Sequence, residues 1–353
     1  MTMDAAAAAR SLLEDAIARR VTPGAVLHAV ARDGRELRLA VGCLTYDEGS
    51  APVTEDTVYD LASLTKVVSC LPLLLHLLAA GEVRLTDKVS RFFSNAGWFQ
   101  EPSLGDVTIE DLALHRSGLP AWKPVFANVS TRLTAVANVL QTPLADHAGS
   151  FVYSDLGVIV LGAIVERVTG ERIDAAFRRV VAEPMGLSTL TYAPLPAGVA
   201  VAPTEDDGLR GLLQGVVHDE NAWAMDGVSS HAGLFGTVAD VTRYAQAWLR
   251  LEAPFASSEW LAEAVKDRSS GKGPALGLLW RLRDPEEWPI GDGVSVRTFG
   301  HTGFTGTSIV VEPDAGWTCV LLTNRVHPRR GDTSPISSLR RAVHETVARA
   351  FGD

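Results

Sequence analysis

Stretches with β-strand character lie near both ends of this chain, and a long region with helical periodicity separates them. Near the N-terminus, two β-rich runs in TPGAVLHAVARDGRELRLAVG flank Asp33 and Gly34, a dipeptide typical of a two-residue hairpin turn. Near the C-terminus, VRTFGHTG and TSIVVEPDAGWTCVLLTN predict a strand and a hairpin turning at Asp314–Gly316, and a helix follows. The pattern predicts one antiparallel sheet built from both termini and flanked by helices.

The region between these strands, roughly residues 67 to 250, is mainly helical in pattern. Apolar residues recur at spacings of three and four in TIEDLALHRSG, LGVIVLGAIVERVTG and TVADVTRYAQAWLRL. Thr108 and Asp111 are expected to form a capping box, and Gly118 and Gly170 stand where helix C-caps belong. The middle of the chain is therefore predicted to be a helical insertion.

At 353 residues, the chain is longer than most chains that fold around a single hydrophobic core, which favours two domains. We predict a mixed fold, α/β plus all-α. Residues 1–66 and 236–353 would form the α/β sheet domain, and residues 67–235 would form a mainly helical domain. The active site is expected in the cleft between them.

The overall composition is that of an ordinary globular protein, with 46% hydrophobic and 21% charged residues. The formal net charge is −10 and no cluster of basic residues stands out, so a nucleic-acid partner is not expected. The apolar run from Val67 to Ala80 is too short to span a bilayer and is interrupted by Pro72 and His76. It predicts a buried core helix, and we expect no membrane partner.

The three cysteines, Cys43, Cys70 and Cys319, are an odd number and lie far apart in the sequence. Reduced thiols are therefore expected, rather than a disulfide framework or a zinc site. The first twenty residues carry several charges and lack an apolar segment of signal-peptide length, so they predict an amphipathic surface helix. Together these features favour a cytoplasmic location.

Ser63 and Lys66, in SLTK, stand at the start of the apolar run. On a helix, residues three apart share a face, so the hydroxyl and the amine would be neighbours. A helix N-terminus favours an alkoxide and burial favours a neutral lysine, so the pair suits a serine nucleophile activated by lysine. The motif by itself is common, and a solvated cap with a surface lysine is the simpler interpretation.

Two further short motifs suit the same chemistry. Tyr153, in VYSDLG, precedes an apolar helix, where an aromatic residue is usually part of the core rim; as a functional residue, its phenol would relay a proton. His301 and Gly303, in FGHTGFTGTS, lie on an expected strand, where glycine often indicates close approach of a ligand or backbone. An imidazole there would bind substrate or move protons, whereas the simpler alternative is a strand-end turn with a solvent-facing histidine.

Taken together, S-x-x-K, Y-S-D and H-T-G in this order resemble the three signature elements of the serine β-lactamase and penicillin-binding-protein superfamily. The likeness points to its branch of class C β-lactamases, D-aminopeptidases and family VIII esterases. The stretches GEVRLTDKVSRF, TIEDLALHRSGLPAW and GLFGTVADVTRYAQAWL also look like that family, so the resemblance covers nearly the whole chain. It implies a β-lactamase/transpeptidase-like fold and a serine hydrolase of amide or ester bonds that uses no metal or organic cofactor.

The resemblance also implies a role for each matching residue. Ser63 would attack a carbonyl and become acylated, while Lys66 and Tyr153 would share the general-base work. Tyr153 would then activate the deacylating water. The backbone N–H groups of Ser63 and Phe304 would form the oxyanion hole. Substrate binding would fall to Asp155, His301, Thr302 and Gly303.

Two residues depart from the family pattern. Asp155 stands where the family usually has Asn, and an ionised carboxylate can only accept hydrogen bonds. Its charge would raise the pKa of Lys66, which favours a charged Lys66 that holds Tyr153 as a phenolate; alternatively, Asp155 meets a cationic substrate group. His301 replaces the usual lysine, and a largely neutral imidazole should hold substrate carboxylates less firmly. This shifts the expectation towards esterase, aminopeptidase or amidase activity.

A polar cluster in VVHDENAWAMDGVSSHAGLF is a further candidate site. Its spacing matches no compact metal-ligand motif, so no metal is predicted, and we expect a loop over the cleft in which His218 and Asp219 hold the loop or touch substrate. The stretch resembles a loop of cytoplasmic or peptidoglycan-directed homologues, which favours muropeptide-type amides. The cluster consists of His218, Asp219, Glu220, Asp226 and His231.

Three functional hypotheses follow. The first is a serine hydrolase that forms an acyl-enzyme on a small or peptidoglycan-derived ester, amide or peptide. The alternative is a penicillin-binding D,D-peptidase or a weak class C-type β-lactamase, and the third is a non-catalytic binding protein. Loops near Trp122, Trp223 and Phe304 are expected to shape the pocket, while the acyl group, the leaving group and the oligomeric state are left open by the sequence.

Overall fold

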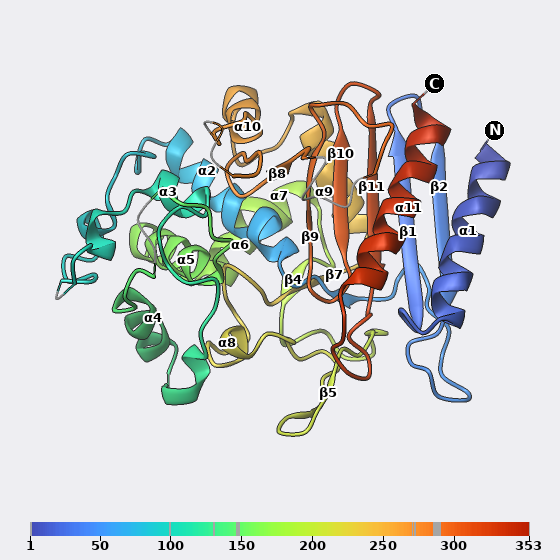
Figure 1. Ribbon diagram of the computed structural model, residues 1–353, viewed down its shortest axis with the longest axis horizontal. Helices are drawn as coiled ribbons and strands as arrows, with labels where there is room; N and C mark the ends of the chain where they lie inside the picture. The colour runs from blue at the N-terminus through green and yellow to red at the C-terminus, as the bar shows by residue number, and fades with distance from the viewer. Residues whose placement is uncertain are drawn as a thin grey trace.

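The strands near the two ends of the chain form one six-stranded antiparallel sheet. The computed structural model describes residues 2–98, 100–129, 131–145, 149–269, 271, 273–284 and 291–352. The sheet has the order β2-β1-β11-β10-β9-β8 (Figure 1), which confirms the predicted fold class. Its strands are β1 Gly24–Ala31, β2 Glu36–Gly42, β8 Arg281–Leu282, β9 Phe299–Thr302, β10 Ser308–Glu312 and β11 Trp317–Thr323.

Strand β1 joins the two ends of the chain. It pairs with β2 through a tight turn in which Gly34 has φ 88°, the left-handed conformation that glycine adopts without strain. On its other side β1 pairs with β11, with Ala25 opposite Thr323. The predicted Asp33–Gly34 hairpin is therefore confirmed, and the sheet cannot form without both termini.

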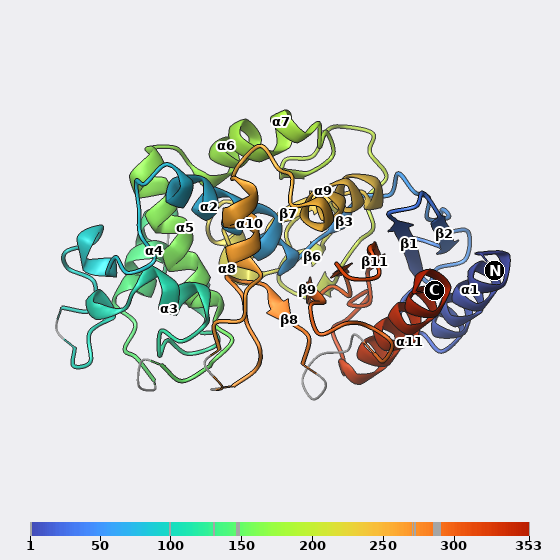
Figure 2. The same cartoon turned by 90° about the horizontal axis from the view of Figure 1, so that it is seen from above.

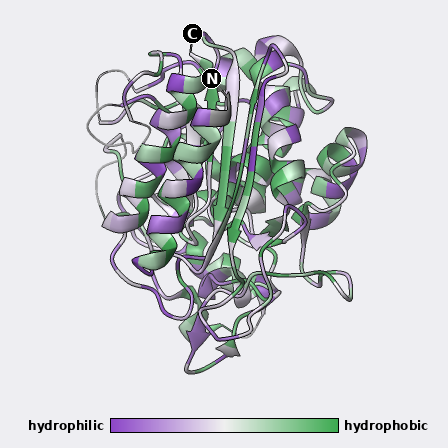
Figure 3. Cartoon of the chain, turned by 90° about the vertical axis from the view of Figure 1, so that its right-hand side faces the viewer, coloured by the Kyte–Doolittle hydropathy of each residue, from purple (hydrophilic) through white to green (hydrophobic). Residues whose placement is uncertain are grey.

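Helices cover both faces of this sheet. Helices α1, Thr2–Ala18, and α11, Ser334–Phe351, pack side by side on one face, and α9, Val238–Arg250, packs on the other (Figure 2). The sheet strands are mostly apolar, as Figure 3 shows, and every residue of β10 and β11 is buried. Burial of both faces explains why these strands read as continuous apolar runs rather than as alternating ones.

The remaining helices lie to one side of the sheet (Figure 1). The predicted capping box at Thr108 and Asp111 and the Gly170 C-cap are present, whereas Gly118 caps no helix, because α3 already ends at Ala113. These helices are α2 Leu71–Ala79, α3 Ile109–Ala113, α4 Arg132–Leu140, α5 Asp155–Thr169, α6 Ile173–Phe177, α7 Glu183–Met185, α8 Glu220–Trp223 and α10 Ser258–Ala264.

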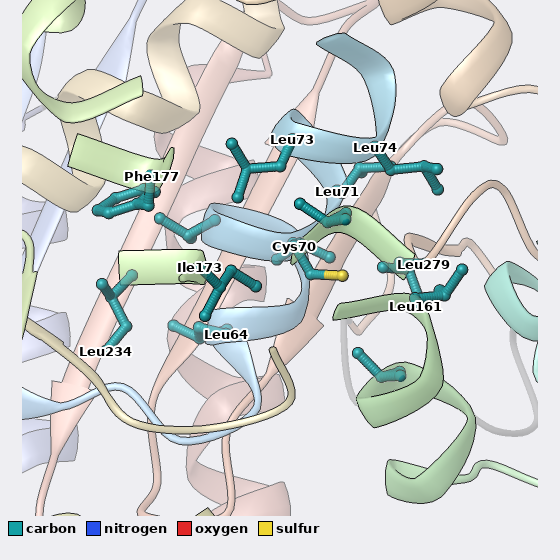
Figure 4. Close-up of a cluster of buried hydrophobic side chains, with 14 of the residues drawn as sticks. Leu64, Cys70, Leu71, Leu73, Leu74, Leu161, Ile173, Phe177, Leu234 and Leu279 are labelled. Carbon is teal, nitrogen blue, oxygen red and sulfur yellow. The ribbon is translucent and has the colours of Figure 1, made fainter. Parts of the chain in front are cut away.

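The apolar run after Ser63 forms the centre of the main core. It begins as a π-helical segment, Lys66–Cys70, and continues directly into α2. Leu71 and Leu74 pack among side chains from α5, α6 and other elements (Figure 4). This confirms the predicted buried helix. No helix within the described residues combines the length and the apolar character needed to cross a bilayer.

Two small sheets were not predicted. The first has three strands in the order β3-β7-β4. They are β3 Tyr59–Asp60, β7 Leu234–Gly236 and β4 Thr191–Tyr192. The backbone N–H of Leu61 continues the pairing by donating to the carbonyl of Leu234 at 2.9 Å. This sheet fixes the chain immediately before Ser63. The second pair is β5 Asp206–Asp207 with β6 Gly211–Leu212.

Candidate active site

Ser63 lies in a turn between β3 and the central helix. The preceding residue, Ala62, has φ 47°, a left-handed conformation that is strained for a residue with a side chain. The carboxylate of Asp60, which is 2% exposed, holds this turn by accepting from the backbone N–H groups of Ala62 and His218, both at 2.8 Å. A buried carboxylate therefore ties the serine turn to the loop that contains His218.

Lys66 is fully buried behind Ser63. Its Nζ atom donates to the Oγ atom of Ser63 at 2.8 Å and to the carbonyl of His231 at 3.3 Å, and forms an ion pair with Oδ1 of Asp155 at 2.7 Å. An ammonium has three N–H donors and no lone pair, and oxygens of Ser63, His231 and Asp155 all lie within 3.3 Å of this nitrogen. The geometry therefore suits the charged form of the lysine.

Electrostatics favour the same protonation state. Burial lowers the pKa of Lys66, but the Asp155 carboxylate and the Tyr153 side chain raise it, and the net effect is a raised pKa. Of the two opposing effects that the sequence suggested for Lys66, ion pairing with Asp155 outweighs burial.

Tyr153 stands immediately before the N-cap of α5 and faces Lys66, whose Nζ atom lies 5.0 Å from the centre of its ring. Two histidine rings flank it, His115 at 4.7 Å and His301 at 6.0 Å between ring centres. Burial, followed by the charge of Lys66, lowers the pKa of both histidines, in His115 to about 3. Both imidazoles are therefore neutral near pH 7.

His301 is 1% exposed, so the alternative of a solvent-facing histidine is wrong. Its Nδ1 atom lies 2.9 Å from the Thr302 carbonyl, which fixes the N–H at this nitrogen because a carbonyl can only accept. A neutral, buried imidazole supplies no positive charge to the cavity.

The turn after His301 lies against the serine turn. Thr305 Oγ1 donates to the carbonyl of Asp60 at 2.8 Å, and Thr307 Oγ1 donates to that of Leu61 at 3.1 Å. Between them the two backbones approach so closely that a Cβ atom on Gly303 would lie 2.6 Å from the Leu61 carbonyl oxygen. Only glycine fits this position, as the interpretation of a close backbone approach anticipated.

Two backbone donors remain unused where these turns meet. Among the described residues, neither the N–H of Ser63 nor that of Phe304 has a hydrogen-bond partner. Both residues line one cavity. Unpaired donors of this kind can stabilise charge that develops on a reacting oxygen.

The cavity has a volume of about 610 Å³ and gathers nearly all of the predicted residues. Lys66 alone lies behind its wall, in contact with Ser63. The predicted residues that line the cavity are Ser63, Tyr153, Asp155, His218, Asp219, His301, Thr302, Gly303 and Phe304.

The polar loop borders the same cavity, and each of its two histidines lies against a carboxylate. His218 Nε2 lies 3.0 Å from Glu205, and His231 Nε2 lies 2.8 Å from Asp219. Ligand atoms of Asp155, Asp219 and His231 lie within 4.8 Å of one another, a spacing that a cation could bridge. The ammonium of Lys66 already provides positive charge there, since it is paired with Asp155. Burial raises the pKa of Asp219, but contact with His231, the N–H of Ala222 and the charge of Lys66 together outweigh it, so the net pKa is lowered. The absence of a metal site stays a prediction.

Sequence reasoning missed His115, Arg325 and Arg340, which lie at the site. His115 packs on Tyr153, while Arg325 and Arg340 line the cavity and donate to carbonyls of the turn after His301. A signal for Arg340 existed, because it interrupts the apolar stripe formed by Ile336, Val343 and their neighbours on α11.

This chain resembles known proteins over most of its length. The family model described as Beta-lactamase matches residues 9–341. An N-acetylmuramyl-L-alanine amidase of Bacillus subtilis (strain 168) is 32% identical over 86% of this chain and 78% of its own. A putative D-alanyl-D-alanine carboxypeptidase of Escherichia coli (strain K12) is 31% identical over 79% of this chain and 72% of its own.

A solved structure shares the fold at lower identity. EstCE1, a hydrolase with promiscuous acyltransferase activity, aligns over 97% of this chain and 99% of its own with a TM-score of 0.78 and 20% identity. The family match covers most of the chain, and relatives above 30% identity match it across more than three quarters of its length. The chain therefore belongs to the Beta-lactamase family, and it is a serine hydrolase.

Proposed function

We propose that this protein is an amidase or peptidase that forms an acyl-enzyme on Ser63 and releases an alanine-type amino acid from a peptidoglycan-derived amide. The observation that carries the proposal is the contact of 2.8 Å between Ser63 Oγ and Lys66 Nζ at the edge of a cavity that Tyr153 also lines. A nucleophile in hydrogen-bond contact with a group that lowers the cost of its deprotonation is the requirement for covalent catalysis.

In acylation, Tyr153 is the proton acceptor. Lys66 as an ammonium has no free lone pair, so it acts by stabilising negative charge on the phenolic oxygen and on Ser63 Oγ. The proton of Ser63 moves to Tyr153 as Oγ bonds to the substrate carbonyl carbon. The carbonyl oxygen becomes an oxyanion that accepts from the N–H groups of Ser63 and Phe304.

The intermediate collapses when the bond between the carbonyl carbon and the leaving nitrogen breaks. Tyr153 returns its proton to that nitrogen, which departs as an amine and leaves an ester on Ser63. In deacylation a water molecule gives a proton to Tyr153 and attacks the ester carbon. The proton then passes to Ser63 Oγ, and the carboxylic acid product leaves.

The substrate class follows from the relatives and from the cavity. The two curated relatives are named for amides in which alanine is bonded through its nitrogen, either to a muramyl group or to a second D-alanine. The cavity of about 610 Å³, with charged and aromatic side chains in its wall, suits a small polar molecule. His301 supplies no charge, which argues against tight binding of β-lactam carboxylates through this residue.

A direct test compares wild type with Ser63→Ala on N-acetylmuramyl-L-alanine and D-alanyl-D-alanine peptides, with p-nitrophenyl acetate as a general acyl donor. Wild type should release alanine from one of the amides, and a fluorophosphonate probe should label Ser63. Unchanged turnover by Ser63→Ala would refute the mechanism. Turnover of nitrocefin at the rate of a dedicated β-lactamase, without amide cleavage, would favour the β-lactamase alternative.

The place of action is part of the same proposal. All three cysteines are free thiols, and two of them, Cys70 and Cys319, are buried. Free thiols suit a reducing compartment, so we propose the cytoplasm, where the protein would process small peptidoglycan fragments. Detection of the protein in a cell fractionation with an antibody tests this location.

A further inference from the structure

We propose that Arg340 is a positioning residue for catalysis: it orients and polarises the peptide group between Gly303 and Phe304, one of the two that offer an N–H to the reacting carbonyl oxygen. This inference rests on the proposed function, because it presupposes an oxyanion at Ser63. Arg340 lies on α11, outside all the motifs that the sequence singled out.

The contact that carries the inference is a hydrogen bond of 2.7 Å from Arg340 Nη2 to the carbonyl oxygen of Gly303. The carbonyl of Gly303 and the N–H of Phe304 are the two ends of the same planar peptide group. Any donor that binds this oxygen therefore fixes the direction of the Phe304 N–H. It also withdraws electron density from the amide, which makes the N–H a stronger donor.

Two further hydrogen bonds hold the turn that contains this peptide. Arg340 Nη2 also donates to the carbonyl of Thr307 at 2.8 Å, and the N–H of Gly306 donates to Gly303 at 3.0 Å. Arg340 thus spans both ends of the turn formed by residues 303–307. Because Thr307 Oγ1 in turn donates to the Leu61 carbonyl, the turn cannot move without disturbing the chain that leads to Ser63.

The charge of Arg340 is unusually uncompensated. Its side chain is buried, with the residue 6% exposed, its Nε atom has no partner, and no carboxylate among the described residues pairs with the guanidinium. Burial, and then the nearby charge of Arg325, lower its pKa to about 9. A neutral side chain would avoid this desolvation cost. A buried cation of this kind can stabilise negative charge that develops nearby during a reaction. The cavity beside Phe304 is where the proposed oxyanion would form.

The competing interpretation is that Arg340 only stabilises the structure of the turn. Steady-state kinetics distinguish this role from an effect on the oxyanion. A donor that acts on the oxyanion stabilises the transition state and leaves binding of the neutral substrate nearly unchanged, so kcat falls while KM stays constant. A loosened turn would displace Phe304 and Thr302 in the cavity wall and would change KM as well.

The experiment uses Arg340→Lys and Arg340→Gln, with Arg341→Gln as the matched control, in full-length protein. Arg341 is the next residue of α11 and lies at the surface, where it pairs with Glu345 and Asp292. With p-nitrophenyl acetate, Arg340→Gln should lower kcat by about 10- to 100-fold at constant KM, Arg340→Lys should recover part of the loss, and the control should match wild type. Phenylboronic acid forms a tetrahedral adduct with a catalytic serine, and its inhibition constant should rise in parallel with the loss of kcat.

Folding of each variant is checked by its thermal midpoint. If Arg340→Gln does not fold, Arg340→Lys decides, because it keeps a positive charge but replaces the planar guanidinium by a single ammonium on a shorter side chain. A wild-type kcat in either folded variant, or a loss confined to KM, overturns the inference. Loss of activity in Ser63→Ala together with full activity in Arg340→Gln would refute the role of Arg340 alone, whereas activity in Ser63→Ala would refute the proposed function itself.

Discussion

The Nζ atom of Lys66 lies 2.7 Å from the Oδ1 atom of Asp155, so the buried ammonium has its counter-charge in place before any substrate binds. Asp155→Asn leaves a buried cation without its carboxylate and should lower the free energy of unfolding by about 3 kcal/mol. The raised pKa of Lys66 means that this residue is charged at neutral pH, and its contribution to stability is lost as pH rises through the raised value. Urea unfolding at pH 7 measures the difference.

Asp106→Asn is the control for that measurement. Asp106 also pairs with a lysine, Lys88, at 2.8 Å, but both side chains are more than half exposed. Its removal should change stability by less than about 0.5 kcal/mol. Equal effects of the two substitutions would show that the Lys66–Asp155 pair behaves like a surface ion pair.

Tyr153→Phe removes the proposed proton acceptor and leaves the ring packed between His115 and His301. We expect kcat for p-nitrophenyl acetate to fall by about 10²- to 10⁴-fold with little change in KM, because the hydroxyl acts only as protons move. Tyr46→Phe, which removes a phenol that does not line the active-site cavity, should leave kcat unchanged. A loss of less than threefold in Tyr153→Phe would assign the proton transfer to another group.

Gly303→Ala should abolish the close approach of the two turns. The added Cβ atom would lie 2.1 Å from Thr307 Oγ1 and 2.6 Å from the Leu61 carbonyl oxygen, so the backbone must shift and the Phe304 N–H must move with it. We expect a loss of about 10²-fold or more in kcat. Gly331→Ala adds the same methyl group where no atom lies within 4 Å, and its activity should equal that of wild type. Similar kinetics for the two variants would contradict the predicted position of the oxyanion.

His115 predicts a loss of stability in mild acid. Burial lowers its pKa to about 3, so below about pH 6.5 the unfolded chain binds a proton there that the folded protein does not. The free energy of unfolding should fall by about 1.4 kcal/mol for each pH unit between roughly 6.5 and 3 on account of this residue. His115→Asn, which can still accept from the N–H of Ser154, should reduce the slope by that amount in urea titrations at pH 4.5, 5.5 and 7.5. An unchanged slope would mean that His115 becomes protonated in the folded state.

The main elements of the fold could be predicted because their signals are local. The hairpin turn at Gly34, the capping box at Thr108 and the C-cap at Gly170 each depend on residues a few positions apart. The small β3-β7-β4 sheet could not be found, because strands of two or three residues show no periodicity. It nevertheless positions Ser63. The division into two domains at residues 66 and 236 remains a prediction.

The family resemblance allowed us to anticipate that the motif residues lie close together. It did not predict what surrounds each of their side chains. Burial of His301 depends on packing against Tyr153 and on the strands beside it, and no neighbouring residue in the sequence reports it. The contact of Arg340 with Gly303 joins a helix to a turn 37 residues earlier. Such contacts depend on how whole elements pack, which short spacings do not encode.

The pairing of β1 with β11 sets the order in which this protein can become active. Ala25 leaves the ribosome well before Thr323, which lies almost 300 residues further along the chain, so the sheet closes only after β11 has been synthesised. The turn containing Phe304 comes from the same late portion. Ser63 is therefore synthesised long before the second oxyanion donor, the N–H of Phe304. Hydrolytic activity should appear in one step, late in synthesis, once that turn has joined the sheet.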